Sequence, residues 1–166
     1  LAFSRGQELA QKNMRRTSME AKGLYKIFID TGGLIALLDE NDPYHKESSE
    51  FYRFLKKNSL LFTSLLVVSE TYTWLRYHSS HSTANSFLKI IEKAMKTGYI
   101  KIIFPDTDLI SKTHAVLNEY QDQALSYTDA LSFVILELYS IEDVFGFDSH
   151  FFIIKRNLWP IVKRKS

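Results

Sequence analysis

Residues 24–33, with the sequence LYKIFIDTGG, decide the fold. An apolar run from Leu24 to Ile29 leads into Asp30, and a Thr-Gly-Gly sequence follows. Short apolar runs that end at glycine-rich sequences are typical of buried strands that lead into a turn. We therefore predict a strand over 24–30, with the Asp30 carboxylate at its carboxyl end.

Similar apolar runs recur along the chain, and helical patterns separate them. Short strands that alternate with helices are typical of an α/β fold with a mostly parallel sheet. Further strands are predicted at 60–63, 100–104 and 143–148, with an edge strand at 158–162 that Pro160 marks as an edge. Helices are predicted at 34–38, after Asp42-Pro43, at 65–77, 82–97 and 106–120, from Ser126, and at 149–153.

Two of these helices need a separate argument. The segment 65–77 is rich in β-branched and aromatic residues, which favour a strand. Thirteen residues is long for a strand, however, and Val67, Thr71 and Leu75 recur at helical spacing, so we predict a helix. The helix after residue 42 is expected to begin with Asp42 as its cap and Pro43 at its first position.

Length and composition limit the class of protein. The chain has 166 residues, of which 45% are hydrophobic and 24% are charged, which is ordinary for one globular domain. With 0 cysteines, disulfide scaffolds, thiolate zinc sites and cysteine nucleophiles are excluded. No apolar run approaches the roughly 18 residues that cross a bilayer, so we expect a cytoplasmic protein with no membrane partner.

Residues 1–23 contain no apolar segment of the secretory kind and are expected to form an N-terminal extension. Met14 and Met19 are both candidate natural starts, so part of this extension could be foreign to the natural protein. One domain is expected over 24–166.

The net charge of +2 conceals an asymmetry between the ends and the middle of the chain. Residues 1–26 carry six basic and two acidic side chains, and residues 155–166 carry five basic and none acidic. The remaining residues are acidic on balance. Basic ends around an acidic middle suit a phosphate backbone that meets a cation at its centre, although solvated basic tails on an acidic domain explain the pattern as well.

Four carboxylates stand where amphipathic patterning does not require them: Asp30, Glu70, Asp129 and Asp148. Three of them have a structural explanation as helix caps, because Asp30 and Asp148 precede predicted helices and Asp129 ends a Ser-Tyr-Thr-Asp capping-box pattern. Glu70 is expected on the apolar face of its helix, where a glutamate must be paired, protonated or bound to a cation.

The joint placement of these four residues points to a metal site. In open α/β sheets, ligands bind beyond the carboxyl ends of the strands where the strand order reverses, and Asp30 and Asp148 stand at the carboxyl ends of two predicted strands. Carboxylates that converge there cannot all stay ionised unaided. Mg²⁺, which Mn²⁺ can replace, suits carboxylate ligands and can activate water for phosphodiester hydrolysis.

Four sequence blocks carry a resemblance to a known family. The blocks IFIDTGGLIALLDENDPYHKES, TSLLVVSE, LSYTDALSFVI and FGFDSHF follow one another between residues 27 and 152. In this order they resemble the PIN-domain family, and most of all the VapC-type toxins of toxin–antitoxin pairs. The resemblance implies a three-layer sandwich whose central, mostly parallel sheet of four or five strands is flanked by helices.

The resemblance also assigns an activity and a site. It implies a Mg²⁺-dependent endoribonuclease whose acidic quartet falls on Asp30, Glu70, Asp129 and Asp148, with Glu70 completing the cluster or orienting the attacking water. It further implies an RNA substrate, a cognate antitoxin protein and a homodimer. Thr31 and Thr128 match hydroxyl positions of the family and are expected to support the ligands rather than to bind metal. Gly32-Gly33 departs from the family pattern and is expected to loosen the backbone beside the metal.

Two alternatives stay open. One is an RNA-processing or structure-specific nuclease of the same fold without an antitoxin. The other is a catalytically silent PIN-like module that binds RNA or a protein. His150 could shape the site or be an ordinary turn histidine. Candidate RNA contacts are the basic groups near the motif blocks and three aromatic rings: Arg76, Lys155, Arg156, residues 163–165, Tyr44, Tyr72 and Trp74.

Overall fold

The computed structural model describes residues 25–55 and 59–161. The predicted N-terminal extension and the basic segment 163–165 lie outside the described residues. No helix within the described ranges is long and apolar enough to cross a membrane.

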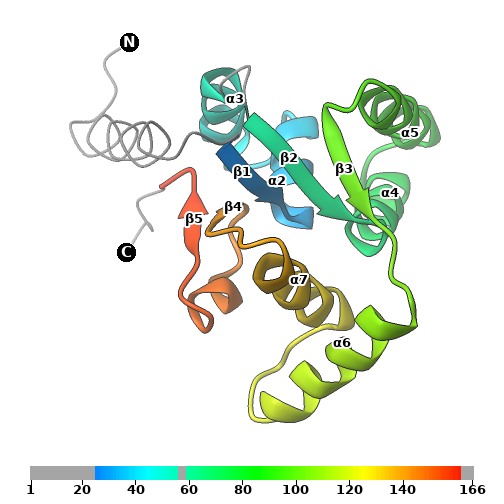
Figure 1. Cartoon of the computed structure of the whole chain (residues 1–166). Helices are drawn as coiled ribbons and strands as arrows, with labels where there is room; N and C mark the ends of the chain where they lie inside the picture. Colours follow the sequence, from blue (N-terminus) through cyan, green and yellow to red (C-terminus); the bar gives the residue numbers. More distant parts are fainter. Residues whose placement is uncertain (1–24, 56–58, 162–166) are drawn as a thin grey trace.

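A five-stranded sheet forms the centre of the molecule (Figure 1). Its strand order is β3-β2-β1-β4-β5, and every neighbouring pair is parallel. The prediction of an α/β fold with a parallel sheet of four or five strands is confirmed. The strands are β1 (Tyr25–Ile29), β2 (Ser59–Ser64), β3 (Ile100–Ile103), β4 (Asp143–Phe145) and β5 (Asn157–Trp159).

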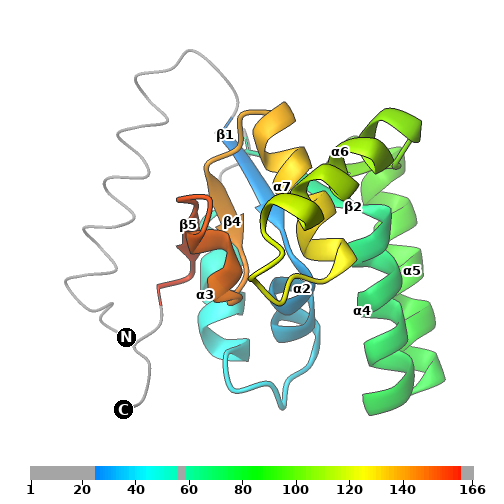
Figure 2. The same cartoon turned by 90° about the horizontal axis from the view of Figure 1, so that it is seen from below.

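Helices cover both faces of the sheet, as the two views show (Figures 1 and 2). The helices that precede β2 and β3 lie on one side, and those between β3 and β4 lie on the other, as right-handed crossovers require for this strand order. The elements are α2 (Thr31–Leu38), α3 (His45–Phe54), α4 (Leu65–His78), α5 (His81–Lys96), α6 (Thr107–Glu119), α7 (Tyr127–Leu138) and the short 3₁₀ helix η1 (Ser149–Phe152).

The core is centred on β1 and α7. Ile27, Phe28 and Ile29 are almost fully buried because β1 is the middle strand and is covered on both faces. In α7 every residue from Thr128 to Leu136 except Asp129 is buried. The helix predicted from Ser126 thus lies in the interior of the fold.

The helical prediction for 65–77 is confirmed, since α4 spans Leu65–His78. The predicted cap at Asp42 is wrong. Helix α3 begins at His45, with Tyr44 as its N-cap residue. The Asp42 carboxylate instead accepts a hydrogen bond of 2.8 Å from the Tyr44 backbone N–H, a local turn that competes with helix initiation.

The sequence suggested that Gly32-Gly33 loosens the backbone beside the metal. At Gly33 this prediction is wrong. A Cβ atom at this position would lie 2.3 Å from the Phe145 carbonyl oxygen. The first turn of α2 therefore packs directly against the end of β4, which only glycine allows at this distance. This close approach holds the segment after β1 beside the segment after β4.

Candidate metal centre

The strand order reverses between β1 and β4, and the candidate site lies at that point. The chain leaves β1 into α2 on one side of the sheet, and it leaves β4 into η1 on the other. The Asp30 backbone N–H donates a hydrogen bond of 3.0 Å to the Phe145 carbonyl, so the carboxyl ends of these two strands are level. Asp30 follows β1 directly, and Asp148 lies three residues beyond β4. This is the location at which open α/β sheets bind ligands.

Asp30 is the most enclosed carboxylate of the predicted quartet, with 6% of its surface exposed. Its side chain accepts a hydrogen bond of 3.4 Å from the Gly32 N–H, so it caps α2. Burial raises the pKa of the Asp30 carboxyl from 3.8 to about 7, and the charges of Asp129 and Asp148 add to that increase. The hydrogen bond from the Asp30 N–H to the Phe145 carbonyl places Asp30 beside the loop that leads from β4 to Asp148.

Glu70 lies on α4 and is joined to the site by two hydroxyl groups. Thr31 donates a hydrogen bond of 3.0 Å to its Oε2 atom, and Thr128 donates one of 2.5 Å to its Oε1 atom. Since Thr31 follows Asp30 and Thr128 precedes Asp129, these bonds hold Glu70 beside both aspartates. Thr31 on α2 and Thr128 on α7 thus contact Glu70 from two separate helices.

The expected position of Glu70 on the apolar face of its helix is corrected by the structure. Glu70 is exposed, and the buried side of α4 is formed by Val67, Val68, Thr71 and Leu75. The Glu70 carboxylate therefore does not lie on the buried face of α4. Its side chain is instead oriented by hydrogen bonds to both carboxylate oxygens.

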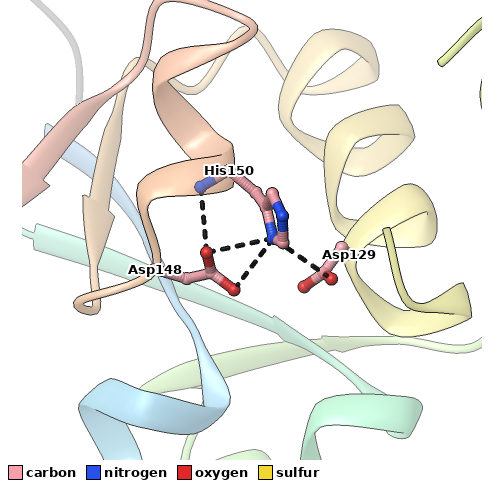
Figure 3. A group of neighbouring side chains, drawn as sticks. All are labelled: Asp129, Asp148 and His150. Carbon is pink, nitrogen blue, oxygen red and sulfur yellow. Dashed lines mark hydrogen bonds and ion pairs between the residues drawn. The ribbon is translucent and has the colours of Figure 1, made fainter. Parts of the chain in front are cut away.

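Asp129, Asp148 and His150 form a compact group (Figure 3). One potential ligand atom from each residue lies within 4.8 Å of the other two. The Nδ1 atom of His150 is 3.1 Å from Asp148 Oδ1 and 3.7 Å from Asp129 Oδ2. All three side chains are partly exposed, so a ligand can reach them from solvent.

The structural explanation considered for the three aspartates, that they serve as helix caps, is confirmed. Ser126 and Asp129 form a complete capping box at the start of α7. Asp148 accepts a hydrogen bond of 2.9 Å from the His150 backbone N–H at the start of η1. Capping fixes the position of each carboxylate and still leaves oxygen lone pairs free.

Sequence reasoning missed the residues that hold the Asp148 loop in place. Gly146 packs against Asp30, because a Cβ there would lie 3.0 Å from Asp30 Cβ. Phe147 stacks on Tyr44 with ring centroids 4.4 Å apart, which secures the loop against the start of α3. The FGFD block contains both loop residues, but only the fold shows what they contact.

Several predicted RNA contacts are engaged within the protein. Tyr44 is stacked on Phe147, as described above, and Trp74 is stacked on His78 with centroids 4.7 Å apart. The Arg156 guanidinium pairs with the Glu137 carboxylate and donates to the Ile154 carbonyl. Arg76 and Lys155 are exposed, and Tyr72 is half-buried against the core.

The site has the composition of a centre for a hard divalent cation. Within residues 25–55 and 59–161, no lysine or arginine forms an ion pair with any of the four carboxylates. Oxygen donors without a cationic partner, one of them deeply buried, fit Mg²⁺ or a similar ion. The described residues thus include a carboxylate cluster that could hold a metal ion.

The sequence matches no protein-family model and no curated protein. Solved structures do match. VapC20 from Mycobacterium tuberculosis, described as a sarcin-ricin loop cleaving toxin, is 23% identical with a TM-score of 0.70, over 79% of this chain and 96% of that chain. FitAcB from Neisseria gonorrhoeae is 14% identical with a TM-score of 0.59, over 81% of this chain and 96% of that chain. FitAB bound to a DNA fragment is 14% identical with a TM-score of 0.58, over 84% and 99%.

These comparisons establish the fold. The described part of the chain has the PIN-domain fold of the VapC type, and the resemblance found in the four sequence blocks is confirmed at that level. Identities of 14–23% do not by themselves carry an activity from one protein to another.

Proposed function

We propose that this protein is a metal-dependent endoribonuclease that hydrolyses RNA phosphodiester bonds. The observation that carries the proposal is the compact group of Asp129, Asp148 and His150 at the strand-order reversal. Asp30 lies at the end of the neighbouring strand β1, and Thr31 and Thr128 hold Glu70 beside Asp30 and Asp129. A fold alone supports many functions, but four carboxylates at this position need a cation or a reason to be neutral.

Each carboxylate has a role in this proposal. Asp30, Asp129 and Asp148 would hold Mg²⁺, which Mn²⁺ could replace. When bound, such an ion would orient the phosphodiester, lower the pKa of water and neutralise charge in the transition state. Glu70 completes the cluster: both its oxygens accept from threonines, and their remaining lone pairs are available to orient a water molecule.

The partners follow from the same resemblance. A VapC-type toxin cleaves RNA, is restrained by a cognate antitoxin and forms a homodimer, and we propose all three for this protein, together with a cytoplasmic location. VapC20, the solved structure described as a sarcin-ricin loop cleaving toxin, supports an RNA substrate. Co-purification of a small protein with the native chain, and the mass of the purified chain in solution, test the antitoxin and the dimer separately.

The nuclease is tested with a mixed RNA pool and Mg²⁺ or Mn²⁺. The wild type should cleave, EDTA should abolish cleavage, and Asp129→Asn should lack it. The matched control is Ser126→Ala, which removes the other half of the same capping box and should cost about 1 kcal/mol of stability while keeping activity. Equal cleavage by wild type and Asp129→Asn contradicts the proposal.

A calorimetric titration with Mn²⁺ provides a second readout that does not depend on the choice of RNA. Saturable binding to the wild type that is lost in Asp129→Asn supports the metal centre. A wild type without saturable binding contradicts it and favours a silent RNA- or protein-binding module instead.

A further inference from the structure

His150 is the member of the compact group Asp129, Asp148 and His150 that does not belong to the acidic quartet. Its ring lies between two quartet aspartates, and its Nδ1 atom is the part of the ring that faces them (Figure 3). The backbone of η1 holds it there, since the His150 N–H donates to Asp148 and the Ile153 N–H donates to the His150 carbonyl. The imidazole is therefore placed by the same short helix that places Asp148.

The spacing of these atoms matches that of neighbouring ligands on one ion. In an octahedral site with metal–ligand bonds of about 2.1 Å, two adjacent ligand atoms are about 3.0 Å apart. His150 Nδ1 is 3.1 Å from Asp148 Oδ1, which is close to that spacing. His150 Nδ1 is 3.7 Å from Asp129 Oδ2, and a small side-chain rotation would bring this distance to the same spacing.

We propose that His150 Nδ1 is a direct metal ligand that makes this centre prefer Mn²⁺ over Mg²⁺. The inference rests on the proposed metal centre and goes beyond the four carboxylates assigned to it. Mg²⁺ is a hard ion that selects oxygen ligands, whereas imidazole nitrogen binds transition-metal ions well. A nitrogen ligand therefore stabilises bound Mn²⁺ more than bound Mg²⁺, while an all-carboxylate site would separate the two ions far less.

A positioning role for His150 is the competing explanation. Histidine could orient Asp148 by a hydrogen bond from Nδ1, which is 3.3 Å from Asp148 Oδ2. In that case the nitrogen would stay outside the coordination sphere, and removing it would weaken both ions equally. The two explanations thus differ in a spectroscopic signature and in ion selectivity.

The experiment is pulsed electron paramagnetic resonance on the full chain loaded with one equivalent of Mn²⁺, in the wild type, His150→Ala and His81→Ala. His81 is an exposed histidine at the start of α5, so its variant controls for the loss of an imidazole elsewhere. We expect ¹⁴N modulation of the Mn²⁺ echo in the wild type and in His81→Ala, and its absence in His150→Ala. The Kd for Mn²⁺ should rise about tenfold in His150→Ala, with the Kd for Mg²⁺ changed by less than about threefold.

Other outcomes overturn the inference. Saturable Mn²⁺ binding without ¹⁴N modulation in the wild type removes His150 from the coordination sphere and leaves the proposed nuclease intact. Equal losses of Mn²⁺ and Mg²⁺ affinity in His150→Ala also contradict the selectivity. The proposed function itself fails if the wild type shows no saturable Mn²⁺ binding or if Asp129→Asn cleaves RNA as the wild type does, so the two failures are distinguishable.

Discussion

Thr128 donates a hydrogen bond of 2.5 Å to Glu70, and this contact joins two helices whose residues are 58 positions apart in the sequence. Thr128 is buried at the start of α7, whereas Glu70 is exposed on α4. Thr31 holds the second oxygen of the same carboxylate from α2. Glu70 is thus fixed by two elements other than its own, although solvent reaches it.

We expect Thr128→Val to lower kcat for RNA cleavage by about 10- to 100-fold. Valine keeps the shape of the side chain and removes the hydroxyl, so Glu70 loses one of its two anchors. The free energy of unfolding should change by only about 1 kcal/mol. Single-turnover cleavage and thermal unfolding of the same preparations measure both effects.

A double-mutant cycle shows whether this threonine acts through Glu70. If it does, Thr128→Val combined with Glu70→Gln should be about as impaired as Glu70→Gln alone. Thr73→Val is a matched control. Thr73 lies on α4, the helix of Glu70, and its hydroxyl donates to the Ser69 carbonyl and not to Glu70. Additive losses in the double variant would mean that Thr128 acts independently of Glu70.

Asp30 contributes less stability to the metal-free protein at neutral pH than at acid pH. Its pKa is about 7 in the folded state and 3.8 ordinarily, so the folded state binds the proton more tightly. The stability that this proton contributes is complete below about pH 4 and is lost as the pH rises through 7. Since the carboxyl is buried, up to about 4 kcal/mol is involved.

Asp30→Asn should therefore raise the Tm of the metal-free protein at pH 8, by several degrees, with a difference that shrinks towards pH 4. Asparagine has nearly the same shape, remains a good helix cap and never ionises. The measurement is thermal unfolding in chelator across this pH range, with the exposed Asp122→Asn as control. Added Mg²⁺ should raise the Tm of the wild type and leave the Tm of Asp30→Asn unchanged. A Tm at pH 8 that is lower in Asp30→Asn than in the wild type contradicts the raised pKa of Asp30.

The sequence was sufficient to predict the parallel sheet and the places in the fold of three of the four candidate metal ligands. Asp30 and Asp148 follow apolar strands, and the capping box at Asp129 has a recognisable local pattern, so short-range signals determine them. The exposure of Glu70 was not predictable, because helical spacing gives the angle around α4 but not where its neighbours stop covering it. The orientation of His150 towards Asp129 is likewise a tertiary contact between η1 and α7.

Tyr44 provides a test of a residue whose function the sequence left open. Its ring stacks on Phe147, next to Asp148, instead of standing free for an RNA base. Tyr44→Ala should lower stability by about 1–2 kcal/mol and weaken Mn²⁺ binding, because the loop that carries Asp148 loses its support. Tyr44→Phe keeps the stacked ring and should retain both the stability and the Mn²⁺ affinity of the wild type. If Tyr44→Ala raises only the KM for RNA and leaves metal binding unchanged, the ring serves the substrate instead.

Three glycines beside Asp30 should respond differently to the same added methyl group. A Cβ at Gly33 would lie 2.3 Å from a backbone oxygen of β4, which cannot move without shifting the strand. Gly33→Ala should therefore cost about 3 kcal/mol or more and yield little folded protein. A Cβ at Gly32 meets its neighbours only at 3.8–3.9 Å, an ordinary contact. Gly32→Ala lies within α2 and should gain about 0.5–1 kcal/mol of stability with cleavage largely retained.

Gly146→Ala is the informative member of this series. Its Cβ would lie 3.0 Å from Asp30 Cβ and 3.4 Å from Asp30 Oδ2, so the side chain that must give way is the buried aspartate itself. A displacement of a few tenths of an ångström should cost little stability and reduce kcat about tenfold, since reacting groups tolerate little misplacement. Unfolding curves, Mn²⁺ titrations and cleavage rates of the three variants separate these effects. Full activity in Gly146→Ala would contradict the expected sensitivity of cleavage to the position of Asp30.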